Sequence, residues 1–477
     1  MSAALQRVLG RADLLLFSVC AILTIDTLAS AASMGASWFS WWAITIVMFF
    51  VPYGLMTAEL GAAWPGEGGL YIWVREAFGP FVGSLAAWFY WINNAYWIPS
   101  VYMVFAATFH AIFLKGRVPA WLDAGPGATW LEAGIAIGVT WLSVGIGIVR
   151  LSVSKWVPNL GALVKLLIFL GLGTLGLLGL LSGRPAANEI SLGTILPRFS
   201  DSLVFLPVLL YNALGFELMS SAGDEMKDPQ RDVPRVVLLT GLVIAVVYAL
   251  GILGILLAVP LQKLSLVTGT WDELRILGAS WGTAGDTLVL LLGLGFLYAC
   301  IANIVTWSLG VNRVAATAAF EGALPPFLGR LHPRHGTPHV AFIVMGAIAT
   351  LLLLGNALFS SDDANVFWMV FKLSGLCFLF SYLLAFPAFL KLRLSKPETP
   401  RPYRVPGGTA LAALFSGICF AFIALACVLF FQPSQGADAA HATRETLLLG
   451  GECAATIVVG LVFAARARHS PLQGDPK

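Results

Sequence analysis

The stretch that decides the fold is LLLFSVCAILTIDTLASAASMG, from Leu14 to Gly35. It begins as an apolar run that could cross a membrane, but it loses the helical pattern from Thr24 onward, around Asp26. A second stretch, YNALGFELMSSAG from Tyr211 to Gly223, is interrupted in the same way. Two interrupted apolar segments predict a membrane protein with discontinuous helices at its functional site.

The composition of the whole chain supports this interpretation. Of the 477 residues, 58% are hydrophobic and 11% are charged, whereas ordinary soluble domains carry roughly 25% charged residues. The mean hydropathy is +0.85. These values exclude a soluble enzyme, a disordered chain and a disulfide scaffold. A net charge of +3 gives no indication of nucleic-acid binding. We therefore predict an all-α, polytopic membrane protein with no nucleic-acid partner.

Apolar runs of about 20 residues, enough to cross the hydrocarbon core, recur along the chain. The predicted spans are 14–34, 38–62, 81–113, 130–149, 156–181, 202–222, 235–258, 284–318, 338–358, 364–391, 409–431 and 446–465. This gives about 12 transmembrane helices. Residues 261–283 are less apolar and predict a helix lying on the surface.

The two interrupted segments are the first and the sixth of these spans. Broken helices in matching positions indicate a five-plus-five inverted repeat, with residues 10–200 and 201–395 as its halves. Residues 409–465 then form two additional helices, and 466–477 a short cytoplasmic tail. A break frees backbone groups that lipid cannot satisfy, so a substrate or an ion is expected there. The alternative is that Gly, Ser and Ala only allow close helix packing.

Lys and Arg are concentrated in the predicted loops on the side of both termini. By the positive-inside rule, we expect both termini in the cytoplasm and the chain in the cytoplasmic membrane. Arg7 and Arg11 followed by an apolar run imitate a secretory signal. Because Asp26 interrupts that run and further spans follow, an uncleaved first span is expected instead.

Three charged residues are predicted to lie inside the bilayer, where insertion of a charge costs about 2.5–3.5 kcal/mol. Asp26 is about 18 Å into the first span and Lys165 about 13 Å into the fifth, while Glu217 follows the break in the sixth. We interpret them as candidate proton-coupling residues, with structural ion pairing as the alternative. For Glu217, a second alternative is that the carboxylate only holds the helix break in shape. Lys372 lies nearer the end of its span, so snorkelling to the membrane surface is expected.

Signals for covalent chemistry are missing from the sequence. The six cysteines lie in apolar stretches without a CxxC pair, and no zinc-protease, phosphate-loop or nucleophile-elbow motif is found. We therefore expect no cofactor, no metal and no enzymatic activity.

Several long motifs resemble one transporter superfamily. AELGAAWPGEGGLYIWVREAFGP (Ala58–Pro80) resembles the loop after span two in the amino acid–polyamine–organocation transporters. Gly215–Arg235 is similar to the segment after their sixth span, and Trp307–Pro338 resembles their eighth span with its loop. Within that superfamily, AILTIDTLASAASMG (Ala21–Gly35) and YRVPGG (Tyr403–Gly408) are most similar to the glutamate/GABA antiporter group.

The resemblance implies alternating access, with the substrate's ammonium and carboxylate held by unwound backbone in spans one and six. Trp307 matches the place where related arginine/agmatine exchangers carry a tryptophan over the substrate. Lys165 resembles a span-five lysine that, in proton-coupled relatives, stands where sodium-coupled relatives bind their ion. Together with the polar Asn94 of span three, the candidate substrate-binding residues are Ile25, Asp26, Thr27, Ser30, Asn94, Tyr211, Asn212, Ala213, Gly215 and Trp307.

The first span lacks a signature motif of the superfamily, and this difference bears on which substrate we expect. The usual Gly-Ser-Gly signature is replaced by Asp26-Thr27-Leu28-Ala29-Ser30, and a carboxylate there favours an ammonium over an acidic side chain. We expect a secondary transporter of amino acids, proton-coupled or exchanging, whose partners are the small-molecule substrate, protons and the lipid bilayer. The alternatives are an amino acid/amine or polyamine exchanger and, in another class, a nutrient sensor without transport. The oligomeric state is left open.

Overall fold

The structure is a computed structural model that describes residues 9–149, 151–197, 205–264, 269–278, 282–359, 363–432 and 439–467. Arg7, the start of the predicted sixth span and most of the predicted tail lie outside the described residues. The described residues are helices and connecting turns without a named strand, and one isolated bridge pairs Leu9 with Met226. The predicted all-α class is confirmed.

Ten helical segments within the described residues are long and apolar enough to cross a membrane. The helices that build them are α3 (Ser37–Thr45) with the π-helical turn η1 (Ile46–Phe50) and α4 (Val51–Ala63), α6 (Pro80–Phe109) with η2 (His110–Leu114), α8 (Pro126–Ile148), α10 (Trp156–Leu181), α14 (Pro229–Ala258), α16 (Gly282–Phe320), α17 (His339–Phe359), α18 (Asp363–Ser395), α19 (Gly408–Phe430) and α20 (Ala439–Ala467). The two remaining predicted spans are the interrupted ones.

Both predicted interruptions are present. In the first span, α1 (Arg11–Ile22) ends before a break of five residues, and α2 (Leu28–Ala32) continues after it. In the sixth span, α13 (Leu206–Tyr211) is separated by a short break from the 3-10 helix η4 (Phe216–Glu225). The first break is shorter than predicted, because the Leu and Ala residues around Ser30 are good helix formers and resume the helix.

Short helices connect the spans. They are α5 (Leu70–Phe78), α7 (Ala120–Asp123), α9 (Leu151–Ser154), α11 (Leu192–Ile195), η5 (Leu261–Lys263), α15 (Gly269–Gly278) and η7 (Pro326–Gly329). The predicted single surface helix at 261–283 is thus two helices. Trp271 and Leu274 of α15 are buried, since residues three apart share one helix face and this face packs on α16.

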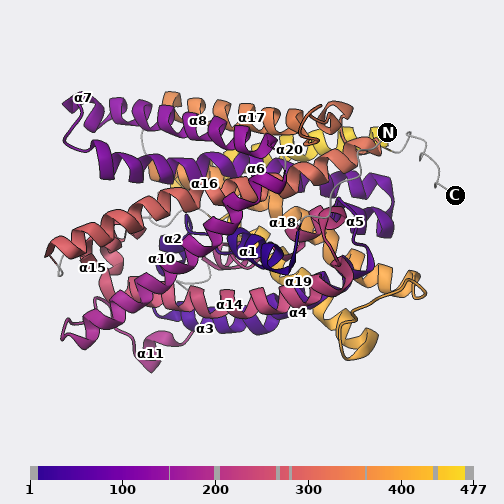
Figure 1. Ribbon diagram of the computed structural model, residues 1–477, viewed down its shortest axis with the longest axis horizontal. Helices are drawn as coiled ribbons and strands as arrows, with labels where there is room; N and C mark the ends of the chain where they lie inside the picture. The colour runs from indigo at the N-terminus through magenta and orange to yellow at the C-terminus, as the bar shows by residue number, and fades with distance from the viewer. Residues whose placement is uncertain are drawn as a thin grey trace.

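The interrupted span α1 lies in the interior of the helix bundle. It packs against α10, α14, α16 and η4, and Figure 1 shows it near the centre, with α8 and α17 on one side and α3 and α14 on the other. The breaks are therefore enclosed by protein rather than by lipid, which is the environment that irregular backbone requires at membrane depth.

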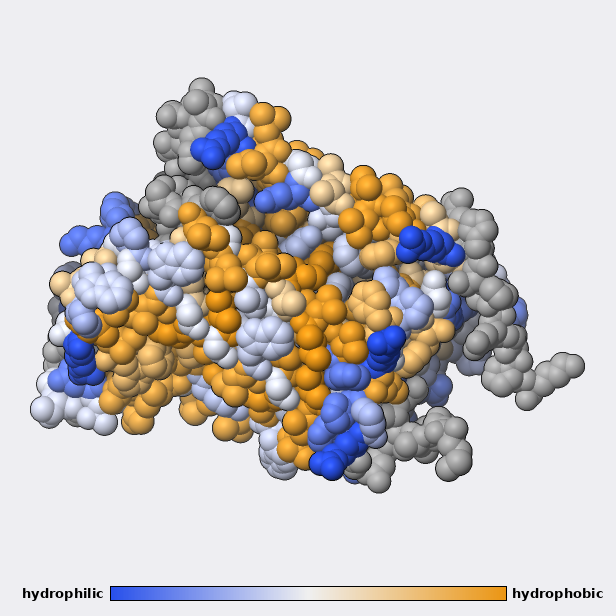
Figure 2. All heavy atoms as spheres, turned by 90° about the horizontal axis from the view of Figure 1, so that it is seen from above, coloured by the Kyte–Doolittle hydropathy of each residue, from blue (hydrophilic) through white to orange (hydrophobic). Residues whose placement is uncertain are grey.

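The surface has the polarity expected of a multi-pass membrane protein. Figure 2 shows hydrophobic residues over the middle of one face and hydrophilic residues gathered toward its two ends. Large apolar side chains such as Leu167, Leu242 and Leu351 are exposed, as lipid-facing residues are. The protein thus presents an apolar belt between polar ends.

Lys372 does not snorkel, contrary to the sequence-based expectation. Its side chain is buried, and the ammonium donates to Glu445 Oε1 at 2.6 Å and to the carbonyl of Gln432 at 2.8 Å. Glu445 comes from α20, which packs on α18. The prediction was wrong because the partner is supplied by a helix distant in sequence.

Candidate functional site

The two breaks are joined by one side chain. The amide oxygen Oδ1 of Asn212 accepts hydrogen bonds from the hydroxyls of Thr24 at 2.9 Å and Thr27 at 2.8 Å. Tyr248 of α14 adds a second link, because its hydroxyl accepts from the backbone N–H of Thr24 and lies 3.0 Å from the carbonyl of the same residue. Freed backbone groups of the first break are therefore satisfied by a tyrosine from another span.

The second break is held by Tyr53 of α4. Its hydroxyl accepts from the backbone N–H groups of Gly215 and Phe216, each at 3.0 Å, and donates to Glu217 Oε2. Gly215 has φ +128°, a conformation that residues with a Cβ rarely adopt. The glycine allows the chain to turn, and the tyrosine satisfies the N–H groups that the turn frees.

Asp26 lies within the first break and is almost completely buried, with 2% of its surface exposed. The indole Nε1 of Trp97 donates to its Oδ2 at 3.3 Å. Its other oxygen, Oδ1, is buried without a hydrogen-bond partner among the described residues. An unsatisfied carboxylate oxygen in the interior is costly, so this atom indicates a place for a ligand that donates hydrogen bonds.

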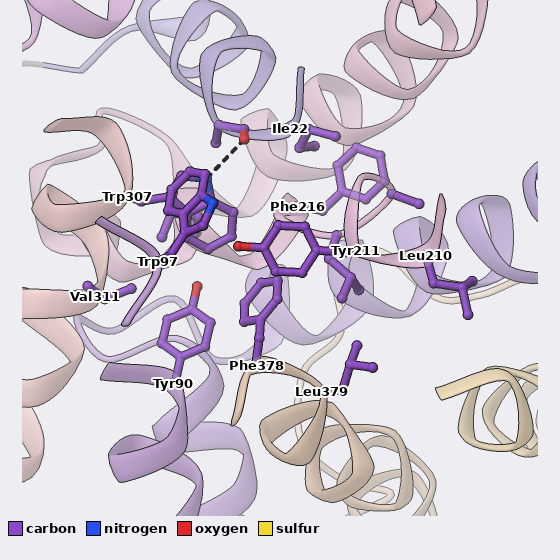
Figure 3. Close-up of a cluster of buried hydrophobic side chains, with 14 of the residues drawn as sticks. Ile22, Tyr90, Trp97, Leu210, Tyr211, Phe216, Trp307, Val311, Phe378 and Leu379 are labelled. Carbon is purple, nitrogen blue, oxygen red and sulfur yellow. Dashed lines mark hydrogen bonds between the residues drawn. The ribbon is translucent and has the colours of Figure 1, made fainter. Parts of the chain in front are cut away.

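Trp97 belongs to a cluster of aromatic rings from four spans. Figure 3 shows Trp97, Trp307, Tyr211, Tyr90 and Phe378 gathered beside the broken helices, with the indole of Trp307 hydrogen-bonded to backbone. That bond goes to the carbonyl of Ala21 at 2.9 Å. The ring centroids of Trp97 and Trp307 are 6.2 Å apart, and Trp307 lies 5.2 Å from Phe378. We call these five residues the aromatic box.

Lys165 lies on α10 and is fully buried. Its ammonium donates to the carbonyl of Cys20 at 2.6 Å and to Oδ1 of Asn303 at 2.8 Å. Cys20 belongs to the last turn of α1, where carbonyls have no helical partner and carry partial negative charge. Lys165 therefore contacts the end of a half-helix directly and makes no ion pair with Asp26.

Glu217 lies at the edge of the aromatic box, in a cluster of phenols. Tyr90 of the box donates to its Oε1 at 2.7 Å, Tyr53 donates to Oε2, and the hydroxyls of Tyr53 and Tyr382 are 3.4 Å apart. A small cavity, lined by Glu217, Tyr53, Tyr382 and apolar residues of α4, α5 and α18, adjoins this cluster. Through these two hydrogen bonds, Glu217 connects Tyr90 of the aromatic box with Tyr53, which holds the second break.

The remaining predicted residues divide into two groups. Ile25, Ala213 and Ser30 are buried at or beside the breaks, and the Ser30 hydroxyl and the Asn212 amide nitrogen have no partner among the described atoms. Asn94 is bonded elsewhere: its amide donates to Ser308 Oγ and Met345 Sδ, each at 3.0 Å. The structure therefore does not connect Asn94 to either break.

Sequence analysis missed four residues that shape the site. Trp97, Tyr90, Tyr53 and Tyr248 each contact a break or one of its carboxylates. A signal existed for two of them, because residues seven apart lie on one face of a helix, as Tyr90 and Trp97 do on α6. Tyr53 and Tyr248 carried no such signal, since each is a single tyrosine in an apolar run.

The arrangement is suited to holding a cation without a metal. Within the described ranges, no group of three or more His, Cys, Asp or Glu residues could hold a metal ion. An ammonium at Asp26 would donate a hydrogen bond to the carboxylate and lie near the indole of Trp97, and these two interactions favour organic cations.

Comparison with known proteins identifies similar chains. The family model described as amino acid permease matches residues 9–459. The probable agmatine/putrescine antiporter AguD of Lactococcus lactis subsp. lactis is 33% identical over 91% of this chain and 90% of its own length. The polyamine transporter PUT1 of Oryza sativa subsp. japonica is 27% identical over 88% and 70%, respectively. The glutamate/gamma-aminobutyrate antiporter of the same Lactococcus lactis strain is 24% identical over 84% and 80%.

Proposed function

Because the chain belongs to the amino acid permease family of the amino acid–polyamine–organocation superfamily, we propose that it exchanges cationic amines for amino acids or other amines across the cytoplasmic membrane. The cargo crosses unchanged, without covalent chemistry. The chain is a multi-pass membrane protein, and the bias of Lys and Arg supports cytoplasmic termini.

The observation that carries the proposal is the free oxygen Oδ1 of buried Asp26, whose other oxygen accepts from Trp97 of the aromatic box. A carboxylate binds an ammonium and repels a second carboxylate, so the site favours a substrate end with a positive charge. The names of two relatives, an agmatine/putrescine antiporter and a polyamine transporter, support the same substrate class.

A second candidate function is transport of an ordinary amino acid. It is favoured by the name of the glutamate/gamma-aminobutyrate antiporter, a relative of this chain. The main difference between the two candidates is whether the substrate must carry a carboxylate. That difference can be tested directly.

Coupling is assigned to the buried charged residues. Lys165 contacts the carbonyl end of α1, so loss of its proton would weaken the hold of α10 on that half-helix. Glu217 joins the second break to the phenols of α4 and α6. We assign proton coupling to these two residues together with Asp26. We assign the transport cycle to alternating access, in which the bundle of spans one, two, six and seven moves against the remaining spans.

The test is counterflow in proteoliposomes. Purified protein is reconstituted with unlabelled cargo inside and labelled putrescine outside, and the internal cargo is changed in turn to putrescine, agmatine, GABA, glutamate or alanine, with and without a pH gradient. We expect rapid exchange with the two cationic amines, slower exchange with the zwitterions and almost none with glutamate.

Control liposomes without protein and with the Asp26→Asn variant accompany each measurement. Exchange of glutamate or alanine at the rate of putrescine would show that the carboxylate does not select cations. If these ligands bind but no labelled ligand crosses the membrane, the protein is a sensor and the transporter proposal is wrong.

A further inference from the structure

Asn303 of α16 is a fully buried polar side chain in an apolar span, and it contacts the ammonium of Lys165. Its oxygen Oδ1 accepts from Lys165 Nζ at 2.8 Å. Its nitrogen Nδ2 is buried without a hydrogen-bond partner among the described atoms, and a buried donor without an acceptor lowers stability. Packing therefore does not explain an amide at this position, whereas the bond to Lys165 does.

The ammonium of Lys165 is held by two oxygens that carry no formal charge. One is Oδ1 of Asn303, and the other is the backbone carbonyl of Cys20, at 2.6 Å. Among the residues that the structure describes, no carboxylate forms an ion pair with Lys165. A carboxylate partner would strongly favour the charged form of a lysine. Neutral oxygens hold the ammonium in place and still allow its proton to leave.

Other titratable groups act on Lys165 only from a greater distance. Within the described part of the chain, these groups are Cys20 of α1, Cys300 of α16 and Asp26 of the first break. None of their side chains is hydrogen-bonded to Nζ, because the contact with Cys20 is made by its backbone oxygen. On the neighbouring α14, the hydroxyl of Tyr248 is bonded to Thr24 instead. Asn303 is therefore the side chain whose replacement changes the immediate surroundings of the ammonium.

We propose that Asn303 is a positioning residue for Lys165 and sets the pH range over which Lys165 exchanges its proton with water. The inference rests on the proposed function, in which Lys165 takes part in proton coupling. The amide oxygen places the ammonium against the carbonyl end of α1 and stabilises it by one hydrogen bond. A charged acceptor in its place would keep the proton on Lys165 throughout the cycle, and an apolar side chain would release the proton at lower pH. In either case the movement of α1 would no longer follow the pH gradient.

The test compares two substitutions that act in opposite directions. Asn303→Asp keeps the shape of the side chain and adds a negative charge, whereas Asn303→Leu keeps a similar volume and removes the acceptor. Exchange of labelled putrescine in proteoliposomes is measured over a series of pH values, with equal pH on both sides. We expect the midpoint of the pH profile to rise by about one unit or more in Asn303→Asp, because an adjacent opposite charge favours the ammonium, and to fall in Asn303→Leu. Both variants should lose most of the accumulation that a pH gradient drives in the wild type.

The matched control is Thr306→Val, about one turn further along α16. The Thr306 hydroxyl donates to the carbonyl of Ala302 and to Sγ of Cys20, so this substitution disturbs the same pair of helices without removing a partner of Lys165. Its pH profile should remain that of the wild type. Unshifted midpoints in both Asn303 variants, or shifts in the same direction, would overturn the inference. If Asn303→Leu does not fold, an unshifted midpoint in Asn303→Asp is sufficient to reject it.

The variant Lys165→Met separates this inference from the proposed function. If Lys165→Met accumulates putrescine in a pH gradient as the wild type does, Lys165 is not a coupling residue and both proposals are wrong. If Lys165→Met loses accumulation while both Asn303 variants keep the wild-type profile, the coupling role of Lys165 stands and the role of Asn303 is wrong.

Discussion

The indole of Trp97 holds one oxygen of Asp26, at 3.3 Å, and leaves the other oxygen without a partner in the described protein. Trp97 comes from the third span and Asp26 from the break in the first. The hydrogen bond orients the carboxylate, and in the proposed function the free oxygen accepts a hydrogen bond from the substrate's ammonium. We therefore expect substitutions of Asp26 and of Trp97 to lower substrate affinity by different amounts.

Asp26→Asn should weaken binding of a cationic amine by roughly ten- to a hundredfold, because a hydrogen bond to a charged group contributes about 1.5–3 kcal/mol. Trp97→Phe keeps a ring but removes the donor, so a smaller loss is expected. Isothermal titration of the purified variants with putrescine measures both. Equal affinities for wild type and Asp26→Asn would remove Asp26 from the substrate site.

Lys165→Met should retain exchange but abolish accumulation driven by a pH gradient. Met fills similar space without a charge, so the coupling contribution is removed while packing is largely kept. The carbonyl of Cys20 and the amide oxygen of Asn303 lose their donor, at about 1–3 kcal/mol for each buried group, so the melting temperature should also fall. Uptake into proteoliposomes with an imposed gradient tests the coupling. Wild-type accumulation in the variant would contradict this role.

Glu217→Gln should slow exchange more than it weakens binding. Glu217 accepts from Tyr53 and Tyr90 and supports the second break rather than the free oxygen of Asp26. We expect at least a tenfold lower maximal rate with KM changed by less than threefold, consistent with a role in movement between states. Tyr90→Phe is the matched variant and should show the same pattern. A change confined to KM would instead place Glu217 in contact with the substrate.

Gly215→Ala should abolish transport. Its φ of +128° disfavours a Cβ, and the added atom would lie 3.0 Å from Ile22 Cγ1 and 3.1 Å from Trp307 Cζ2, so strain and crowding act together at the break. Gly138→Ala is the control, because that position on α8 is open and Ala favours a helix. Measuring the transport rate and the melting temperature of both variants tests whether the added Cβ blocks transport without unfolding the protein. A fully active Gly215→Ala would show that the break tolerates rearrangement.

Glu76 lies on the connecting helix α5, and its hydrogen bonds lead us to expect that the stability of the protein depends on pH. Burial opposes its ionisation, but hydrogen bonds from Lys396 and Arg75 outweigh burial and lower the pKa of the carboxyl below its usual value. A lowered pKa in the folded state stabilises the protein above the unfolded pKa, and this contribution is lost as the pH falls through the folded value. Glu76→Gln should therefore lower the melting temperature at pH 7 and have less effect near pH 3. A larger fall in melting temperature at acid pH than at pH 7 would contradict a lowered pKa of Glu76.

Local sequence was sufficient for the spans and the breaks. The predicted span 156–181 coincides with α10, Trp156–Leu181, because hydropathy depends on each segment and the bilayer rather than on neighbouring helices. Asp26 and Lys165 were identified for the same reason, since a charge within an apolar run is recognisable without a structure.

The partners of those charges were decided by tertiary structure. Trp97 lies 71 residues from Asp26, Cys20 lies 145 from Lys165, and Glu445 lies 73 from Lys372. Hydropathy gives the depth of a side chain but not the direction in which its helix faces. Rotation and packing of the helices set that direction. The sequence therefore determined a membrane transporter with two broken helices, and only the packed bundle decided that Asp26 meets Trp97 while Asn94 is bonded away from the breaks.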